Sequence, residues 1–322
     1  MKLVVVIPIF NEQENLNELF NRVRESCDSI DEIDWSVIYV NDGSHDRSAA
    51  MITDQNRQDS RFTLVELSRN FGHQAALSAG IAHTPDDADA IVIMDGDLQD
   101  PPEVIPDLVQ AWRDGGQVVR AERRSRQDRG IRRIGFDAFH RIFSLVSDFP
   151  FERNAGTFSL LDRQAVIEFN QLPERNRFIP GLRSWIGFDQ RTVYYDRHAR
   201  AAGSPKQTLA RLVRYAMDAI FSFSYKPLRL MTWFGVMVSS MGFALACFFV
   251  IRRLTGLEQA EMGFTTLVTL ILFMGGIQLI AIGLLGEYLG RIYDEVKDRP
   301  LYIVRRTTGF DGKDHPIEDA SV

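Results

Sequence analysis

Residues 90–103 read AIVIMDGDLQDPPE, a short apolar run that ends in a cluster of acidic residues. The apolar part, residues 90–94, is rich in β-branched side chains, which favours a buried strand. Asp95 and Asp97 follow at its carboxyl end. Two carboxylates one residue apart can bind the same hard divalent cation, and such a cation can hold a diphosphate. Taken alone, the pattern also fits an ordinary solvated turn.

Three similar apolar blocks precede this one along the chain. Stretches with helical spacing separate them, as in Leu16, Leu19, Phe20 and Val23. The alternation predicts a Rossmann-like α/β fold with a mostly parallel sheet covered on both faces. Ligands of such sheets bind beyond the carboxyl ends of the strands, so the polar residues after each block are the candidate site. The three blocks are residues 2–9, 35–40 and 62–67.

Two further polar turns are expected at the same edge of the sheet. Glu12 follows the first block, and residues 41–44 (NDGS) follow the second, which would bring Asp42 to this rim. A turn that only caps the next helix is the alternative for residues 41–44. His45 and His73 also fall in loops at the rim, and we interpret them as polar loop residues rather than metal ligands.

The C-terminal third of the chain is much more apolar. Residues 230–251 and 263–286 contain no charged side chain, and each run is longer than the ~20 residues that a helix needs to cross a bilayer. They predict a two-helix transmembrane hairpin, with two buried core helices as the alternative. Basic residues are denser on the outer sides of these runs than in the link 252–261, so we expect both termini in the cytoplasm.

These features divide the chain into four parts. We expect a catalytic domain (1–205), an amphipathic helix in the membrane interface (206–228), the hairpin (229–288) and a cytoplasmic tail (289–322). The first apolar run is too short for the core of a signal peptide. The net charge of -6 argues against nucleic-acid binding. Residues 301–304 are strand-like, and we expect them to pair with a neighbouring subunit of a homo-oligomer.

Five motifs occur in order, at residues 8–12 (PIFNE), 40–44 (VNDGS), 69–72 (RNFG), 95–103 (DGDLQDPPE) and 172–178 (LPERNRF). Together with the hairpin they resemble the family-two glycosyltransferases. Within that family they are similar to the polyprenyl-phosphate glycosyltransferases related to dolichyl-phosphate mannose synthase and bactoprenol glucosyltransferases. The resemblance covers most of the chain. It implies a GT-A fold, a multi-pass protein of the bacterial cytoplasmic membrane and a role in glycosylation of the cell envelope.

The resemblance also implies roles for individual residues. Mg²⁺ or Mn²⁺ would bind to Asp95, Asp97 and Gln99, and catalytic roles would fall to Asp97 and Arg129. The nucleotide of the donor would contact Pro8, Phe10, Glu12, Asp42 and Asn70. The phosphate of the acceptor would contact Arg123, Arg129, Arg132, Arg133, Arg200 and Lys206. For any single one of these arginines, a solvated helix face is the alternative.

The implied reaction is transfer of a sugar from a nucleotide diphosphate-sugar to polyprenyl phosphate. UDP-glucose and undecaprenyl phosphate are expected, with mannose from GDP-mannose or an amino sugar as alternatives. Many relatives carry Gly-Asp-Phe where this chain has Gly156, Thr157 and Phe158, and Thr157 cannot act as a base near neutral pH. A phosphate monoester is already mainly ionised there, with a second pKa of about 6, so we predict a single displacement with inversion and no general base.

Three other functions are weighed against this one. An aspartyl-phosphate phosphotransferase would use Asp95 as its nucleophile, but Leu98 and Gln99 stand where such enzymes place a small hydroxyl residue. A non-catalytic nucleotide-sugar sensor would need the fold without turnover, yet both carboxylates are present. A processive polysaccharide synthase would need more membrane helices and a Gln-x-x-Arg-Trp element, to which only residues 181–185 (GLRSW) are similar.

Overall fold

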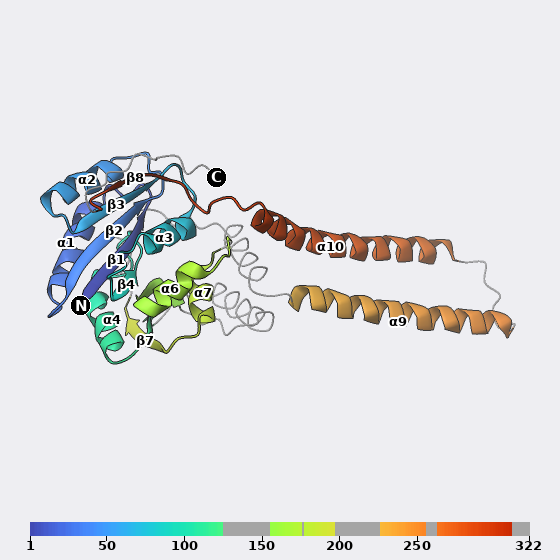
Figure 1. The fold of residues 1–322 in the computed structure, drawn as a ribbon. Helices are drawn as coiled ribbons and strands as arrows, with labels where there is room; N and C mark the ends of the chain where they lie inside the picture. Colours follow the sequence, from blue (N-terminus) through green and yellow to red (C-terminus); the bar gives the residue numbers. More distant parts are fainter. Residues whose placement is uncertain (125–154, 176, 197–225, 256–262, 311–322) are drawn as a thin grey trace. The chain divides into compact units, whose positions relative to one another are not determined.

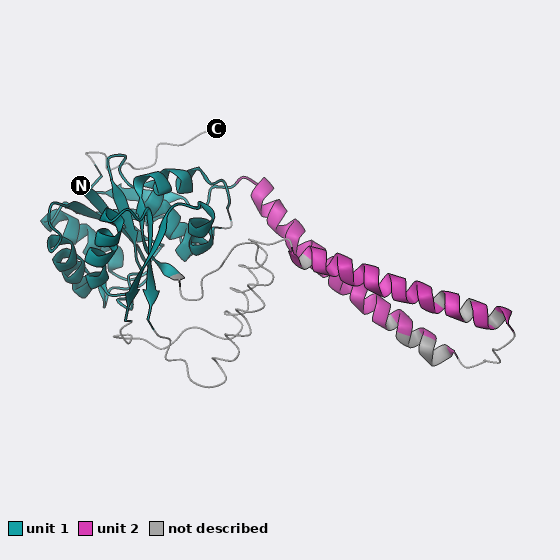
Figure 2. Cartoon of the chain, turned by 90° about the horizontal axis from the view of Figure 1, so that it is seen from below, with its two compact units in different colours: residues 1–140, 149–207, 299–322 teal, residues 141–148, 208–298 magenta. Residues whose placement is uncertain are grey.

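The computed structural model describes residues 1–124, 155–175, 177–196, 226–255 and 263–310 (Figure 1). The chain divides into two compact units, which are coloured separately in Figure 2. The first unit comprises residues 1–140, 149–207 and 299–322, and the second comprises residues 141–148 and 208–298. The first unit contains the sheet and the second contains the two long helices.

The sheet of the first unit has eight strands in the described part of the chain, in the order β7-β5-β6-β4-β1-β2-β3-β8. β1 is parallel to β2 and β4, and β2 is parallel to β3. β6 and β8 run antiparallel to β4 and β3. The predicted α/β fold with a mostly parallel sheet is therefore confirmed. The strands are β1 (Lys2–Ile9), β2 (Asp34–Asn41), β3 (Phe62–Leu67), β4 (Ala90–Ile93), β5 (Val118–Arg123), β6 (Ala155–Asp162), β7 (Gln190–Tyr195) and β8 (Val304–Thr308).

Helices cover both faces of the parallel strands. Val5 and Ile7 of β1 belong to a core cluster that includes residues of α1 and α4. On the opposite face α3 packs so closely that a Cβ atom at Gly80 would overlap Val6 and lie 2.9 Å from Val40. Strands that are buried on both faces are continuous apolar runs, which makes them visible in the sequence. The helices are α1 (Leu16–Asp28), α2 (Ser48–Gln58), α3 (His73–Ala82), the short 3-10 helix η1 (Pro102–Val104), α4 (Ile105–Arg113), α6 (Arg163–Gln171) and α7 (Ile179–Trp185).

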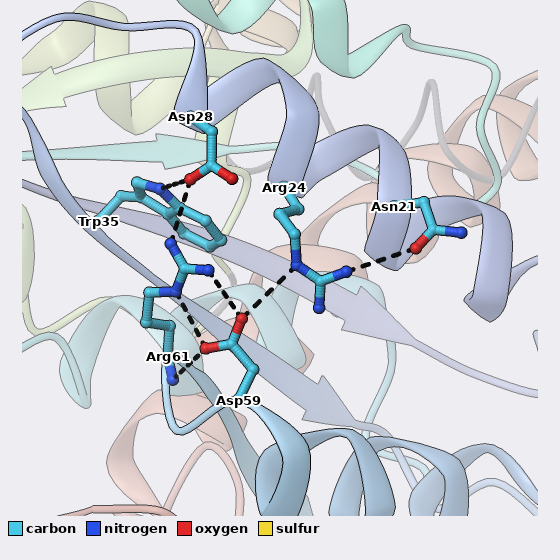
Figure 3. Close-up of polar contacts among 6 residues, drawn as sticks. All are labelled: Asn21, Arg24, Asp28, Trp35, Asp59 and Arg61. Atoms are coloured by element: carbon cyan, nitrogen blue, oxygen red, sulfur yellow. Dashed lines mark hydrogen bonds and ion pairs between the residues drawn. The ribbon is translucent and has the colours of Figure 1, made fainter.

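A polar cluster joins the end of α1 to the amino ends of β2 and β3, away from the strand ends that carry the predicted site (Figure 3). Arg61 forms ion pairs with Asp59 at 2.8 Å and with Asp28 at 3.1 Å. Trp35 Nε1 donates a hydrogen bond to Asp28, and the guanidinium of Arg61 lies 3.9 Å from the centre of the Trp35 ring. Because Arg61 is partly exposed, each ion pair contributes at most about 1 kcal/mol.

The second unit contains α9 (Lys226–Leu254) and α10 (Phe264–Val296), and both helices are long and apolar enough to cross a membrane. α9 contains the predicted run 230–251, and α10 contains the run 263–286 except for its first residue. However, α10 continues well past residue 286. Its last turns are polar and are supported by an ion pair between Glu287 and Arg291, four residues apart, at 3.1 Å. The membrane-compatible segment of α10 is Phe273–Val296, so it overlaps the predicted run but extends to the end of the helix.

The tail contains β8, which pairs with β3 of the same chain. The expectation that residues 301–304 pair with a neighbouring subunit is therefore wrong, and the strand itself lies slightly later. Glu66 of β3 explains the pairing, because its buried carboxylate accepts a hydrogen bond from Arg306 Nε at 2.8 Å. The amide of Ser68 also donates to the carbonyl oxygen of Ile303 at 2.9 Å. β8 thereby covers an edge of the sheet that would otherwise expose unpaired backbone groups.

Candidate active site

Hydrogen bonds join the turns after β1 and β2 at the carboxyl edge of the sheet. Asn11 donates its amide hydrogen to Ser44 Oγ at 3.0 Å, and the amide of His45 donates to Asn11 Oδ1 at 2.9 Å. The amide of Glu12 donates to Ser48 Oγ at 3.1 Å. Two of the three predicted polar turns thus form one unit, as expected from the parallel pairing of β1 and β2.

Phe10 and Glu12 lie in the turn after β1, which is hydrogen-bonded to the turn after β2. Phe10 is 42% exposed, and its ring makes an edge contact with His45, with the ring centres 6.5 Å apart. An exposed aromatic ring at a strand end offers a face for stacking on a nucleotide base. Glu12 accepts a hydrogen bond from the side chain of Asn15 at 2.6 Å. Pro8 lies beneath them, half-buried in β1 beside Val40.

Asp42 is buried and holds the turn that precedes α3. Its two carboxylate oxygens accept hydrogen bonds from the amides of Phe71 at 2.7 Å and Gly72 at 3.0 Å. Burial raises the pKa of Asp42, and these two hydrogen bonds oppose that rise. Gly43 is needed next to it, because φ is +68° and a Cβ atom would lie 2.6 Å from the backbone of Asn70. Asn70, the last of the predicted nucleotide contacts, is exposed in this turn.

Asp95 lies just past the end of β4, and two side chains contact the same oxygen of its carboxylate. His73 Nε2 lies 3.0 Å from Asp95 Oδ1, and the hydroxyl of Thr157 donates to that oxygen at 3.1 Å. Burial raises the pKa of Asp95, His73 opposes the rise, and the negative charges of Asp100 and Asp97 add to it. His73 was interpreted as a loop residue from the sequence, and only the geometry brings it to the acidic cluster.

The backbone between Asp95 and Gln99 is held in an unusual shape. A Cβ atom at Gly96 would lie 2.6 Å from Ile9 Cδ1 and 3.1 Å from the carbonyl oxygen of Pro8, so this turn packs directly on the end of β1. Leu98 has a left-handed φ of 57°, which costs about 1 kcal/mol for a residue with a side chain. Its side chain is buried, and this burial fixes the turn. The amide of Gln99 then donates to Asp97 Oδ1 at 3.1 Å.

Asp100 anchors the same turn to the far strands of the sheet. It is 1% exposed and accepts a hydrogen bond from the hydroxyl of Tyr195 at 2.5 Å, while Arg123 Nη2 lies 3.4 Å away. Arg123 also donates through Nε to the Tyr195 hydroxyl at 3.2 Å. Burial lowers the pKa of Arg123, but Asp100 and Tyr195 outweigh that effect and raise it overall. Arg123, which was expected to contact an acceptor phosphate, is therefore already paired with a buried carboxylate.

The acidic turn suits a hard divalent cation. Its oxygen donors are the carboxylates of Asp95 and Asp97 and the side-chain carbonyl of Gln99, and such oxygens favour Mg²⁺ or Mn²⁺ over Zn²⁺. Among the described residues there is no group of three or more His, Cys, Asp and Glu side chains that could hold a metal by themselves. The mutual repulsion of Asp95, Asp97 and Asp100 is a cost that a bound cation would relieve. The residues present thus fit such an ion.

Arg183 is a buried cation next to this region that the sequence did not reveal. It is 1% exposed, and its Nη2 donates to the carbonyl oxygen of Gly156 at 3.2 Å. Burial lowers its pKa to about 9, and the nearby charge of Arg120 adds to the effect. Other predicted contacts of the acceptor phosphate lie outside the described residues: Arg129, Arg132, Arg133, Arg200 and Lys206.

Two protein families match the chain. Glycosyl transferase family 2 matches residues 4–168, and the GtrB C-terminal hairpin matches residues 226–292. The first match contains the turns after β1, β2 and β4, and the second contains α9 and most of α10. The site and the two apolar helices therefore each have a counterpart in a known family.

Proteins similar to the chain over nearly its whole length include an uncharacterized glycosyltransferase of Synechocystis sp., which is 41% identical over 97% of both chains. A bactoprenol glucosyl transferase of Shigella phage SfII is 38% identical, over 95% of this chain and 98% of the phage protein. A mannosyltransferase of Pyrobaculum calidifontis, solved with GDP-Man and Mn²⁺, has a TM-score of 0.45 and 14% identity over 87% of this chain and 86% of that one. A likeness this distant says nothing about which ligands this chain binds.

Proposed function

The chain belongs to glycosyltransferase family 2, and we propose that it transfers glucose from UDP-glucose to undecaprenyl phosphate at the cytoplasmic face of a bacterial membrane. The observation that carries the proposal is the 38% identity to a bactoprenol glucosyl transferase, because the match covers 95% of this chain and includes the hairpin. A soluble relative would share only the sheet. The product would be a lipid-linked sugar for cell-envelope glycosylation.

The donor would bind where the polar turns meet. Phe10 and Asn70 present exposed side chains at this edge, and Pro8, Glu12 and Asp42 shape the turns around them. Asp95, Asp97 and Gln99 would hold Mg²⁺ or Mn²⁺. When bound, the cation would neutralise charge on the donor diphosphate, which is also the leaving group. In this arrangement the base of the donor would bind near Phe10 and its diphosphate near the acidic turn, both at the carboxyl edge of the sheet.

The reaction would be a single in-line displacement. A phosphate oxygen of the acceptor forms a bond to the anomeric carbon, the bond from that carbon to the donor diphosphate breaks, and UDP leaves with the electron pair. The acceptor is already mainly dianionic at neutral pH, with a second pKa of about 6, so no side chain needs to remove a proton. This suits Thr157, whose hydroxyl donates to Asp95. Arginines of the acceptor site, Arg129 above all, would hold the acceptor phosphate.

The membrane arrangement is part of the proposal. We assign residues 1–205 to the catalytic domain, 206–228 to an interfacial helix, 229–288 to the hairpin and 289–322 to a tail. Residues 206–225 of the interfacial helix lie outside the described residues. Basic residues flank the outer ends of the hairpin more densely than its link, which supports placing the catalytic domain and both termini in the cytoplasm. The acceptor could then present its phosphate to the site while its lipid chain stays in the bilayer.

The test is a donor panel with the purified full-length protein in detergent. UDP-glucose, other UDP-sugars and GDP-mannose are each offered with undecaprenyl phosphate and Mg²⁺ or Mn²⁺, and the lipid product is identified by mass spectrometry. Glucose should transfer most efficiently, and Asp97→Asn should lower the rate by at least about 100-fold. A product carrying mannose or an amino sugar would replace glucose as the substrate, and the absence of any glycolipid would refute the proposal. NMR of the product should show an inverted anomeric centre.

A further inference from the structure

Two side chains from distant parts of the chain contact Asp95, and both reach the same oxygen atom. His73 Nε2 lies 3.0 Å from Oδ1, and Thr157 Oγ1 donates to Oδ1 at 3.1 Å. The donors come from different elements: His73 begins α3, and Thr157 lies in β6. A carboxylate oxygen has about two lone-pair positions, and the Thr157 hydroxyl and the His73 ring nitrogen both lie at hydrogen-bond distance from Oδ1.

The second oxygen of Asp95 is arranged differently. Within the residues that the structure describes, Oδ2 has no hydrogen-bond donor, and 32% of the Asp95 side chain remains exposed. When side chains contact one carboxylate oxygen and leave the other without a donor, the second oxygen is oriented for binding a cation. Hydrogen bonds to the oxygen that does not bind the metal fix the direction of such a ligand.

We propose that His73 and Thr157 are positioning residues, which together orient Asp95 so that Oδ2 faces the divalent cation. The proposal rests on the metal-dependent transfer proposed above. It gives the uncharged Thr157 a definite task beside the acidic turn. A threonine at this place has no charge to add to Asp95, Asp97 and Asp100, yet it keeps a donor on Asp95.

The fold makes this convergence possible. Asp42 accepts hydrogen bonds from the amides of Phe71 and Gly72, which fixes the backbone immediately before His73. Gln74 accepts a hydrogen bond from the amide of Ile179 at 2.9 Å, which fixes the backbone immediately after it. β6 is antiparallel to β4 and pairs Ser159 with Ile93, which brings Thr157 beside the residues that follow β4. Both donors therefore lie on rigid supports.

The test measures Mn²⁺ affinity rather than turnover. Purified full-length variants in detergent are titrated with Mn²⁺ in the presence of UDP, and free Mn²⁺ is followed by electron paramagnetic resonance. Thr157→Val removes the hydroxyl at constant shape and should weaken Mn²⁺ binding by about 10-fold, with His73→Phe similar and the double variant nearer 100-fold. Thr157→Ser and His73→Gln keep a donor and should restore binding to within about threefold of the parent.

Three controls separate the possible results. Thr63→Val removes a buried strand hydroxyl that donates to Val37, far from the acidic turn, and should leave Mn²⁺ affinity unchanged. Unfolding curves for all variants identify any that fail to fold. Asp97→Asn should abolish binding, and retained binding would overturn the metal assignment and the proposal with it. If Asp97→Asn loses Mn²⁺ while Thr157→Val and His73→Phe bind as the parent does, the positioning role alone is wrong.

Discussion

At the scale of single residues, Asp95 combines a functional placement with an energetic cost. Its carboxylate lies among Asp97, Asp100 and packed protein, and burial raises its pKa above the ordinary value of 3.8. Two donors on one oxygen reduce the cost without removing it. A site that must attract a cation is expected to carry such uncompensated negative charge, because full compensation by the protein would leave nothing for the cation to neutralise.

Asp95→Asn should therefore raise stability while it removes activity. The amide keeps an oxygen that can accept from Thr157 and contact His73, but it carries no charge. The gain should be on the order of 1 kcal/mol near pH 8 in EDTA. Because the folded-state pKa lies above the ordinary value of 3.8, the penalty on folding grows from about pH 3.8 up to the raised pKa, is complete above it and is absent below pH 3.8. The Tm advantage of Asp95→Asn over the parent should thus be larger at pH 8 than at pH 3.

The matched control for this variant is Asp87→Asn. Asp87 forms an exposed ion pair with Lys2 at 2.8 Å, and that hydrogen bond lowers its pKa. Neutralising Asp87 removes a favourable contact, so this variant should gain no stability at either pH. A Tm for Asp95→Asn that is equal to or below that of the parent at both pH values would show that the ionised carboxylate is not a cost to folding.

Sequence reasoning found some site residues and missed others for a physical reason. Asp95 and Asp97 directly follow an apolar run, so their place at a strand end can be inferred locally. His73, Asp100 and Arg183 take their roles from residues far away in the chain, as in the hydrogen bond between Tyr195 and Asp100. An acidic residue in a turn is usually solvated, and nothing in the local pattern distinguishes the buried Asp100 from a solvated one.

At the scale of elements, the first turn of α3 connects three parts of the catalytic unit. Asp42 after β2 binds the backbone before it, His73 contacts Asp95 after β4, and Gln74 binds the start of α7. The close packing at Gly80 holds the same helix against β1 and β2. A shift of α3 would therefore change the contacts at the acidic turn after β4, at the turn after β2 and at the start of α7.

The attachment of β8 to β3 gives a second prediction at this scale. Arg306 donates to Glu66 at 2.8 Å, whereas Arg305 is more exposed and lies 3.6 Å from the same carboxylate. Arg306→Ala should lower the free energy of unfolding by about 1 kcal/mol and increase hydrogen exchange in residues 304–308. Arg305→Ala is the matched control and should change either quantity little. Equal effects of the two substitutions would mean that the net charge of the tail, and not the hydrogen bond from Arg306 to Glu66, stabilises the pairing of β8 with β3.

The elements that could be predicted from the sequence are those buried on both faces. β1 and β3 have the bounds that their apolar runs predict, and β2 extends its run by one residue at each end. β8 reads VRRTT and has no apolar run of its own, and its partner Glu66 is 240 residues away from Arg306. Pairing over such a distance depends on contacts between residues far apart in the chain, and the local sequence around β8 does not indicate them.

At the scale of the whole molecule, the two units bury apolar surface in different ways. In the first unit the strands β1 to β4 are almost fully buried, whereas Trp233, Phe243 and Leu279 of the second unit are each more than 70% exposed. The membrane-length segments of α9 and α10 are 6% and 0% buried within the structure. Continuous apolar surface of this kind is unfavourable in water at roughly 25 cal/mol per Å², which is consistent with helices covered by lipid.

Cysteine labelling would test the proposed orientation of the hairpin. Cys27 is buried, and burial raises the pKa of its thiol to about 12, so it should not react in the folded protein. With Cys247→Ser as the background, a single cysteine is introduced by Gln259→Cys in the link or by Ser321→Cys in the tail. Both positions lie outside the described residues.

In intact spheroplasts, an impermeant maleimide should label the Gln259→Cys variant at once. It should label the Ser321→Cys variant only after the membrane is permeabilised, because basic residues concentrate on the cytoplasmic side of a membrane protein. The reverse pattern would place the catalytic unit outside, where cytoplasmic UDP-glucose cannot reach it. Labelling of both sites before permeabilisation would mean that the two helices do not span the bilayer. Either result would refute the proposed membrane arrangement while leaving the chemistry of the acidic turn to be tested separately.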